Sequence, residues 1–238
     1  MQEVLFQDLG LRSYKEVWDY QEKLLKEIVD IKIKNRELKE NETSLPTHHH
    51  LLFVEHHPVY TLGKNGKEDH ILISANELQQ KRIEYFQINR GGDITFHGPE
   101  QLVGYPILDL DKFKTDLGWY LRSIEDVIIL TMEEYGIVGG RSKGETGVWI
   151  DAELKGKERK ICAIGIKCSR WVTMHGFAFN ANTDLSYFNN IIPCGIVNKK
   201  VTSLEKELGR KVGMYEVKEK VKNNFEKVFD VQFINNHF

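Results

Sequence analysis

Apolar residues recur along the chain at two spacings, and each spacing predicts one type of element. Helical spacing, with charged side chains between apolar ones, predicts helices over 13–40 and 117–135 and a last buried stripe over 217–229. Short runs of apolar, β-branched and aromatic residues predict strands at 50–55, 83–89, 102–110, 147–151, 160–168 and 172–180. Because Pro106 cannot donate a backbone hydrogen bond, we expect the strand at 102–110 to lie at a sheet edge or to carry a bulge.

The order of these segments predicts the fold class. The strands come in runs flanked by helices, without a regular alternation of strand and helix, which favours an α/β (α+β) fold, a mixed β-sheet covered by helices. One domain over 1–238 is the simplest interpretation, with the helical part at 202–238 as an alternative small lobe. The run Thr202-Ser203-Leu204-Glu205 has the pattern of a capping box and is expected to begin the first of two C-terminal helices.

Composition argues against several classes of function. The 33 basic and 35 acidic residues leave a formal net charge of −2, which does not suit a protein held on nucleic acid by bulk positive charge. No apolar run approaches the ~20 residues that cross a bilayer, and the N-terminus lacks the pattern of a signal peptide. Three cysteines are too few for a disulfide framework, so we expect a cytoplasmic protein in a reducing compartment.

Two segments have a composition that packing alone does not explain. The first, RGGDITFHGP at 90–99, places two glycines after Arg90 and a third after His97. Glycines allow sharp turns and the close approach of a ligand, so this segment is either a tight turn or a ligand-lining loop. In the second segment, small residues alternate with large ones, namely Ala163, Gly165, Gly176 and Ala178. Small residues on one face leave an elongated space for a slender ligand, unless a helix crosses closely there.

Cys194 is the candidate nucleophile, because a proline before it and Gly195 after it hold the thiol on a sharply turned backbone, where the Gly195 N–H could bind an oxyanion. The alternative is a small buried hydrophobe, the commoner role of a lone cysteine. A thiol with the ordinary pKa of ~8.5 is mostly protonated at neutral pH, so a nucleophilic Cys194 needs a base or a cation nearby. The candidates are His97, His175 and Lys160, of which Lys160 stands at the head of the strand with the small residues.

The remaining histidines and cysteines favour structural roles. Five histidines lie close together in the sequence, namely His48, His49, His50, His56 and His57. A metal site would need further ligands, and beyond Glu55 no carboxylate or cysteine cluster stands nearby in sequence, so we expect no metal here. We expect a solvated loop at 48–50 and a turn at 56–58. Cys162 and Cys168 share one face of a regular strand and are expected to fill the core.

Four blocks of sequence carry a resemblance to a known family. They are RGGDITFHGPEQLVGYPILDL (90–110), GVWI (147–150), KICAIGIKCSRWVTMHGFAFNANTDLSYFNNIIPCGI (160–196) and VTSLEKELG (201–209). In this order, and together with EHHPVYTLG (55–63), they resemble the octanoyl-[acyl-carrier-protein]:protein N-octanoyltransferases, also called lipoyl(octanoyl) transferases. The blocks span about half of the chain, so the resemblance does not depend on one motif.

The resemblance implies a fold shared with lipoate and biotin protein ligases, no cofactor, and a cysteine–lysine dyad that falls on Cys194 and Lys160. It places acyl-substrate binding on three segments: Arg90, Gly91, Gly92, Asp93, Ile94, Thr95, Phe96 and His97; Ala163, Ile164 and Gly165; and Gly176, Phe177 and Ala178. It implies transfer of an octanoyl group from octanoyl-acyl carrier protein, through a thioester on Cys194, to a lysine of lipoyl domains. The implied acceptors are the 2-oxoacid dehydrogenase complexes and the glycine cleavage H protein.

The sequence departs from the usual family pattern at two positions. Glu100 stands where glycine usually follows HGP, and Cys162 stands where alanine is often found. Three other functions stay open at this point: an ATP-dependent lipoate ligase, a non-catalytic module that binds lipoyl domains or carrier proteins, and a metal-dependent hydrolase. Because acyl carrier proteins are acidic, basic residues are expected to help docking, and the candidates are Lys64, Lys67, Arg141 and Lys143.

Overall fold

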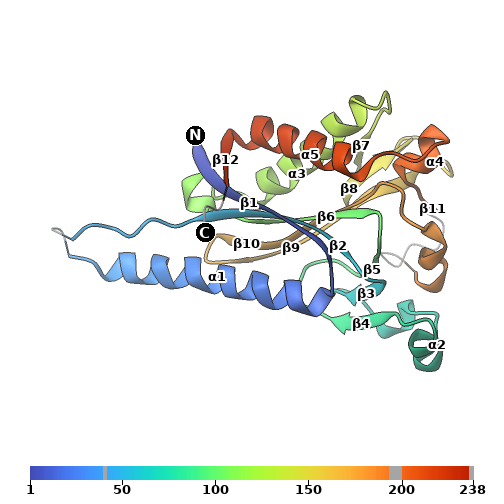
Figure 1. The fold of residues 1–238 in the computed structure, drawn as a ribbon, viewed down its shortest axis with the longest axis horizontal. Helices are drawn as coiled ribbons and strands as arrows, with labels where there is room; N and C mark the ends of the chain where they lie inside the picture. The colour runs from blue at the N-terminus through green and yellow to red at the C-terminus, as the bar shows by residue number, and fades with distance from the viewer. Residues whose placement is uncertain (40–41, 193–199, 236–238) are drawn as a thin grey trace.

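The computed structural model describes residues 1–39, 42–192 and 200–235 (Figure 1). Its larger sheet has nine strands among these residues, in the order β12-β1-β2-β6-β10-β9-β8-β7, with β11 paired to β9. Their bounds are β1 Gln2–Arg12, β2 His49–His56, β6 Gln101–Ile107, β7 Gly140–Ser142, β8 Glu145–Ile150, β9 Arg159–Ser169, β10 Val172–Asn180, β11 Lys200–Val201 and β12 Val231–Asn235. A smaller sheet has the order β4-β3-β5, with β3 Val59–Leu62, β4 Glu84–Gln87 and β5 Ile94–His97.

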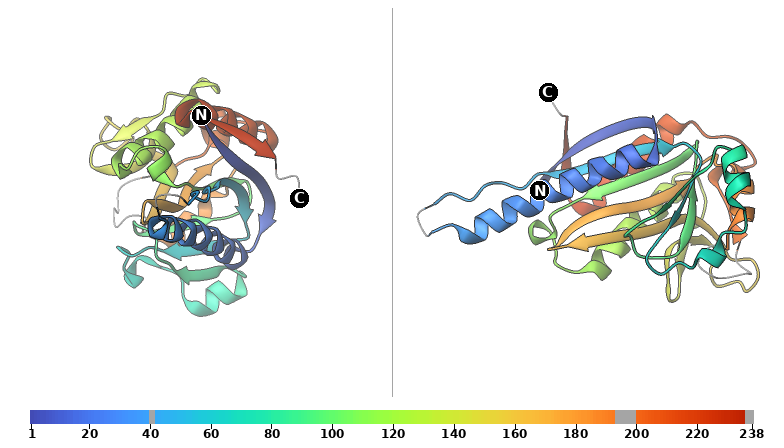
Figure 2. Two further views of the ribbon diagram at one scale, coloured as in Figure 1. Left: turned by 90° about the vertical axis from the view of Figure 1, so that its left-hand side faces the viewer. Right: turned by 90° about the horizontal axis from the view of Figure 1, so that it is seen from below.

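Helices cover both faces of the larger sheet. α1 (Tyr14–Glu37) lies along one face, and α3 (Leu117–Glu133) and α5 (Met214–Phe229) pack against each other on the opposite face (Figures 1 and 2). β1 runs parallel to β2 and β12, whereas β6, β8 and β10 pair antiparallel with their neighbours, so the sheet is mixed. This arrangement confirms the predicted fold class. Two short helices, α2 (Ala75–Gln80) and α4 (Leu204–Leu208), lie outside these layers (Figure 1).

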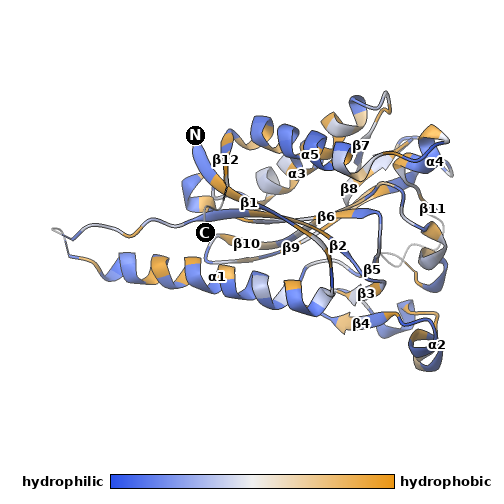
Figure 3. Cartoon of the chain, viewed as in Figure 1, coloured by the Kyte–Doolittle hydropathy of each residue, from blue (hydrophilic) through white to orange (hydrophobic). Residues whose placement is uncertain are grey.

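The alternation of side chains along β2 builds two cores. Leu51 and Phe53 join the core under α3 and α5, while Leu52 and Val54 join the core under α1. The helices carry hydrophobic and hydrophilic positions side by side, as amphipathic helices on a sheet should (Figure 3). Residues of α5 belong to the same cluster as the central strands, so the C-terminal helix shares the main core.

The sheet is built partly by strands that the sequence pattern did not predict. The most N-terminal, β1, has the sequence QEVLFQDLGLR, in which polar residues interrupt the apolar ones. It is a strand because it pairs with β2 on one side and with β12 on the other. Such pairing partners lie far apart in sequence, and the strand preference of a polar segment depends on them.

The prediction for Pro106 was wrong about its position. β6 is a central strand, between β2 and β10, rather than an edge strand. The β6–β10 ladder ends at the pair Gly104–Phe177, so the missing N–H of Pro106 breaks no bond of that ladder. The Pro106 carbonyl instead accepts a hydrogen bond of 2.9 Å from the Thr173 hydroxyl. A side chain on β10 thus replaces part of the ladder.

Two further local predictions were wrong. The capping box is not formed at Thr202, because Ser203 is the N-cap of α4 and its side chain accepts the Lys206 N–H. The segment 48–50 is not wholly a solvated loop: β2 begins at His49, which is 3% exposed. His56 is likewise buried at the end of β2.

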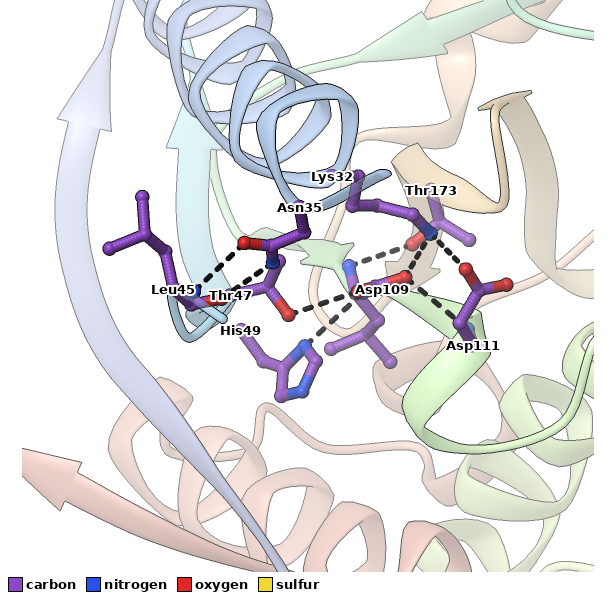
Figure 4. A network of polar contacts seen from close by, with 9 residues as sticks. Lys32, Asn35, Leu45, Thr47, His49, Asp109, Asp111 and Thr173 are labelled. Carbon is purple, nitrogen blue, oxygen red and sulfur yellow. Dashed lines mark hydrogen bonds and ion pairs between the residues drawn. The ribbon is translucent and has the colours of Figure 1, made fainter. Parts of the chain in front are cut away.

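A buried network of polar side chains ties α1 to the sheet (Figure 4). The Lys32 ammonium forms ion pairs with Asp109 and, at 2.8 Å, with Asp111. The Thr47 hydroxyl donates to the other Asp109 oxygen at 3.0 Å, and the Asp109 N–H donates to His49 Nδ1 at 3.2 Å. Because His49 Nδ1 accepts, its ring proton sits on Nε2 and the imidazole is neutral. Each charge of this network has a partner, as burial requires.

Candidate active site

A cavity of about 450 Å³ opens over β9 and β10, beneath the segment that links β4 to β5. Most residues expected at the substrate site line it: Arg90, Gly91, Gly92, Asp93, Ile94, Thr95, His97, Ala163, Ile164, Gly165, Gly176, Phe177 and Ala178. Lys160 lines the same cavity. Segments that lie more than 60 residues apart in sequence, at 90–97 and 160–178, therefore meet around one space.

Two expected site residues are not placed in this cavity. Phe96 turns to the other side of β5, where its ring stacks on Tyr187 with 4.5 Å between centroids and lines a second hollow. Cys194 lies outside the described residues, within 193–199. The chain just before that segment is anchored, because the Ile192 N–H donates to the His70 carbonyl at 2.8 Å.

The glycine-rich loop at 90–93 is held from two sides. Three backbone hydrogen bonds of 3.0 to 3.3 Å join it to residues 63–65, at the end of the EHHPVYTLG motif, and the Gly91 N–H donates to the Ile166 carbonyl on β9 at 2.8 Å. A Cβ at Gly63 would lie 2.3 Å from the Gly92 carbonyl oxygen, so only glycine allows this contact. These contacts hold the loop over β9, where it forms the roof of the cavity.

The small residues form two cross-strand pairs on one face, Ala163–Ala178 and Gly165–Gly176. Part of the space that they leave is taken by the chain itself. A Cβ at Gly165 would lie 2.9 Å from the Gly91 carbonyl oxygen, and a Cβ at Gly176 would lie 2.2 Å from the Gly104 carbonyl oxygen. The two glycines therefore allow close backbone packing, and all four small residues line the cavity.

Replacing Gly176 by alanine is expected to lower the free energy of unfolding by about 3 kcal/mol, because the new methyl group meets a backbone oxygen that cannot move aside. Urea unfolding followed by circular dichroism measures this change. Gly140→Ala is the matched control, since a Cβ at Gly140 meets nothing within 4 Å. Equal stability of the two variants would contradict the packing described here.

Lys160 reaches the cavity because β9 carries a bulge. Val148 pairs with Cys162 but Trp149 pairs with Lys160, so Ile161 has no partner of its own on β8. In a regular strand Lys160 and Cys162 would share one face. The bulge breaks that alternation, so Ile161 and Cys162 both enter the core while Lys160 lines the cavity. The Lys160 ammonium lies 4.6 Å from the centre of the Trp149 ring, a cation–π contact.

A chain of hydrogen bonds crosses the cavity wall. It runs from Arg90 through Thr61, His97, Gln101 and Asn180 to the Thr202 carbonyl. Gln101 donates its two N–H groups to the Asn180 side chain and to the Phe96 carbonyl, so its oxygen accepts from His97 Nδ1 at 2.9 Å. That bond places the His97 proton on Nδ1. Thr61, Gln101 and Asn180 were not predicted from the sequence, because no spacing distinguishes them from other polar residues.

The two imidazoles are poor candidates for the base. Burial lowers the pKa of both His97 and His175 to about 3, so both are neutral at physiological pH and hold a proton weakly. Both ring nitrogens of His97 face the bond partners just described, and His175 Nε2 lies 3.0 Å from the Asn89 side-chain oxygen. These contacts favour Lys160 among the three candidates.

The thiols other than Cys194 are poorly placed for nucleophilic chemistry. Cys162 is fully buried in the core, as predicted, and burial raises the pKa of its thiol well above the ordinary value. Cys168 is only half-buried, so the prediction that it fills the core was wrong, and its partial burial raises the pKa of its thiol. Neither cysteine lines the cavity. Cys162 therefore remains a core residue despite its position next to the candidate site.

Glu100 occupies a backbone position that suits the glycine usual in the family. Its φ angle is +58°, in the left-handed region where most side chains are strained. Its carboxylate forms an ion pair with Lys211 at 2.8 Å and accepts a hydrogen bond from the Asn182 side chain at 3.2 Å. These contacts offset part of the backbone strain.

A family model described as the lipoyl protein ligase A/B catalytic domain matches residues 13–226. The fold is similar to that of lipoate-protein ligase A in a structure with bound ATP, with a TM-score of 0.68 at 12% identity over 99% of this chain and 88% of that one. It is also similar to a biotin protein ligase from Aquifex aeolicus, with a TM-score of 0.51 at 14% identity over 97% and 71% of the two chains. The chain thus has the catalytic fold of the lipoate and biotin protein ligases, as predicted.

Two curated relatives narrow this class. The octanoyltransferase of Christiangramia forsetii is 56% identical over 97% of both chains. The octanoyltransferase of Flavobacterium johnsoniae is 54% identical over 97% of this chain and 98% of its own. The chain belongs to the octanoyltransferase family, and its activity is that of an acyltransferase.

Proposed function

We propose that this octanoyltransferase takes its acyl group from octanoyl-acyl carrier protein and delivers it to a lysine of lipoyl domains, through a thioester on Cys194. The observation that carries the proposal is the single cavity that brings Lys160 together with the glycine-rich roof and the small-residue wall. The cavity also holds apolar side chains that suit an acyl chain, among them Ile94, Val103 and Ile164.

The chemistry proceeds in two acyl transfers. The Cys194 thiolate attacks the thioester carbonyl of the donor, the bond to the carrier's sulfur breaks, and that sulfur leaves as a thiol after taking a proton. The amine of the acceptor lysine then attacks the octanoyl-Cys194 thioester, an amide forms, and Cys194 leaves as a thiol. Lys160 takes the Cys194 proton in the first step and moves protons in the second. Thioester exchange is nearly isoenergetic and amide formation is downhill, so no ATP is consumed.

Burial of the acyl chain supplies binding energy. Each methylene moved from water into an apolar wall contributes ~0.8 kcal/mol, so the chain of an octanoyl group contributes about 5 kcal/mol. The Gly195 N–H is the proposed oxyanion donor, and residues 90–97, 163–165 and 176–178 are the proposed acyl-binding segments.

Exposed basic residues support an acidic carrier protein as the proposed donor. Lys64, Lys67 and Lys143 are exposed and offer positive charge to an acidic carrier protein. Arg141 is a weaker candidate, because its guanidinium is held by the carboxylates of Glu125 and Asp126. A solved structure similar to this chain, with a TM-score of 0.67, belongs to a lipoate protein ligase described together with its E2 lipoyl domain from Thermoplasma acidophilum. We propose lipoyl domains of 2-oxoacid dehydrogenase complexes and the glycine cleavage H protein as acceptors, in the cytoplasm.

Among the described residues, no helix is long and apolar enough to cross a membrane. Within the same residues, no group of histidine, cysteine and carboxylate side chains is arranged to hold a metal ion.

Intact-mass measurement tests the proposal. The chain mixed with octanoyl-acyl carrier protein is expected to gain one octanoyl group, which peptide mapping assigns to Cys194, and Cys194→Ala is expected to gain none. Addition of a lipoyl domain should then remove the group and yield the octanoyl amide. An adduct on Cys162, or transfer that requires free octanoate and ATP, would contradict the proposal; binding without any adduct would indicate a non-catalytic module.

A further inference from the structure

Glu125 is a fully buried carboxylate on α3 that the reaction described above does not use. One oxygen forms ion pairs with Arg122 and, at 2.8 Å, with Arg141. The other oxygen accepts the backbone N–H of Gly147 at 3.0 Å. A charge this deeply buried is costly unless each oxygen is bound, and here both are. The Gly147 bond reaches toward the candidate site, because Gly147 lies beside Lys160.

Gly147 lies on β8, beside the part of β9 that carries Lys160 and Cys162. Its φ angle is +120°, which only glycine adopts without strain. A Cβ at this position would lie 2.5 Å from the Cys162 carbonyl oxygen and 3.5 Å from Lys160 Cε. The backbone of Gly147 therefore packs closely on the strand that carries Lys160, on the side where the end of that lysine side chain lies.

The pairing of β8 with β9 shifts immediately after this contact. Val148, the next residue, pairs with Cys162, and the bulge at Ile161 then brings Trp149 opposite Lys160. The bulge is what turns Lys160 out of the core and into the cavity. The face of β9 on which Lys160 lies depends on this pairing register. A hydrogen bond that holds Gly147 in place therefore also holds the residue from which the shifted pairing begins.

We propose that Glu125 is a positioning residue for Lys160, acting through its hydrogen bond to the Gly147 backbone. Its two arginine partners balance the charge of the carboxylate, and the other carboxylate oxygen fixes Gly147 at the start of the shifted β8–β9 pairing. Glu125 does not line the cavity, so it has no contact with the acyl chain. The inference rests on the proposed role of Lys160 in the acylation of Cys194.

Two variants separate the Gly147 bond from the ion pairs. Glu125→Asp keeps the negative charge but shortens the side chain by one methylene, which withdraws the carboxylate from Gly147 and also lengthens its contacts with the arginines. Arg122→Gln removes one ion pair and leaves the Gly147 bond and Arg141 in place. Each variant is first checked for folding by its melting temperature and circular dichroism spectrum.

The readout is single-turnover acylation of Cys194 by octanoyl-acyl carrier protein, measured by intact mass across donor concentrations and from pH 6 to 9. Glu125→Asp is expected to lower the maximal acylation rate about tenfold or more and to displace its pH profile, with the half-saturating donor concentration unchanged. Arg122→Gln is expected to stay within about twofold of the original chain in all three quantities.

The possible failures are distinguishable. Folded Glu125→Asp with an unchanged rate and pH profile would overturn the inference, and so would an equal loss in Arg122→Gln, because the effect would then follow the ion pairs rather than the Gly147 bond. Absence of any octanoyl-Cys194 in the original chain would instead overturn the proposed function.

Discussion

Lys160→Met is expected to lower the rate of Cys194 acylation about 10²- to 10⁴-fold at pH 7, the range that a positioned proton acceptor contributes. Methionine has similar length and keeps an apolar contact with Trp149, so the loss is chemical rather than one of packing. Without a cation or base beside it, a thiol of ordinary pKa ~8.5 is mostly protonated at this pH. The rate of the variant should therefore rise steadily as the pH approaches 9, when the thiol ionises unaided.

Burst measurements with octanoyl-acyl carrier protein give this rate, and the pH series is recorded on the same preparations. Lys200→Met is the matched control, because Lys200 is an exposed lysine on β11, the strand that pairs with β9 next to Lys160. Its acylation rate should equal that of the original chain. A Lys160→Met enzyme with a normal rate, or a loss that does not diminish at high pH, would contradict the role proposed for this amine.

Lowering the pH from 7 to about 4.5 is expected to unfold the chain cooperatively. Burial lowers the pKa of four buried histidines far below the ordinary ~6.5, to about 4 for His49 and His56 and to about 3 for His97 and His175. In the folded chain these imidazoles stay neutral while the unfolded chain takes up protons. Stability is therefore complete above pH 6.5 and falls as the pH drops from 6.5 toward 4.

The expected effect is large. Each histidine removes about 1 kcal/mol of stability per pH unit in this window, so four of them remove roughly 10 kcal/mol over two to three units. That is comparable to the whole free energy of unfolding of a typical domain. Urea unfolding at a series of pH values measures the slope of stability against pH, which reports the number of protons taken up.

One substitution tests the assignment to particular histidines. In His49→Asn the side-chain oxygen can still accept the Asp109 N–H, but no titrating group remains, so the slope should fall by about one proton. His57→Asn, which removes an exposed histidine of the same segment, is the control and should leave the slope unchanged. A chain whose stability does not vary between pH 6.5 and 4.5 would contradict the burial of these imidazoles.

The histidines also show a limit of sequence patterns. His49 and His56 stand beside polar neighbours, and local composition favours a loop and a turn for them. The structure buries both, because β2 lies in the middle of the larger sheet and its ends are covered by α1 and by the Asp109 network. Burial of a polar residue depends on which distant segment covers it, and that information is not present in its neighbours.

The proposed acyl-binding segments show the opposite case. Arg90–His97 and the small residues of β9 and β10 could be selected from the sequence because glycines and alternating small residues are unusual where packing alone is at work. Lys160 was one of three candidates, and only the resemblance to the octanoyltransferases singled it out. Of the sixteen expected site residues, fourteen line the cavity. Phe96 does not, because strand alternation turns its ring away from the face that Thr95 and His97 share, and it stacks on Tyr187. The assignment of Cys194 as the nucleophile stays a prediction, since it lies outside the described residues.

Local sequence determined the helices, six of the twelve strands in the described residues, the mixed α/β class and the motifs of the octanoyltransferase family, because periodicity and glycine placement act over a few residues. Tertiary structure alone decided that β1 is a strand, that β6 is central, and that a bulge at Ile161 turns Lys160 from the core toward the cavity. The physical reason is that pairing register is set between segments far apart in the chain. A shift of one residue in that register moves a side chain from one face of a sheet to the other.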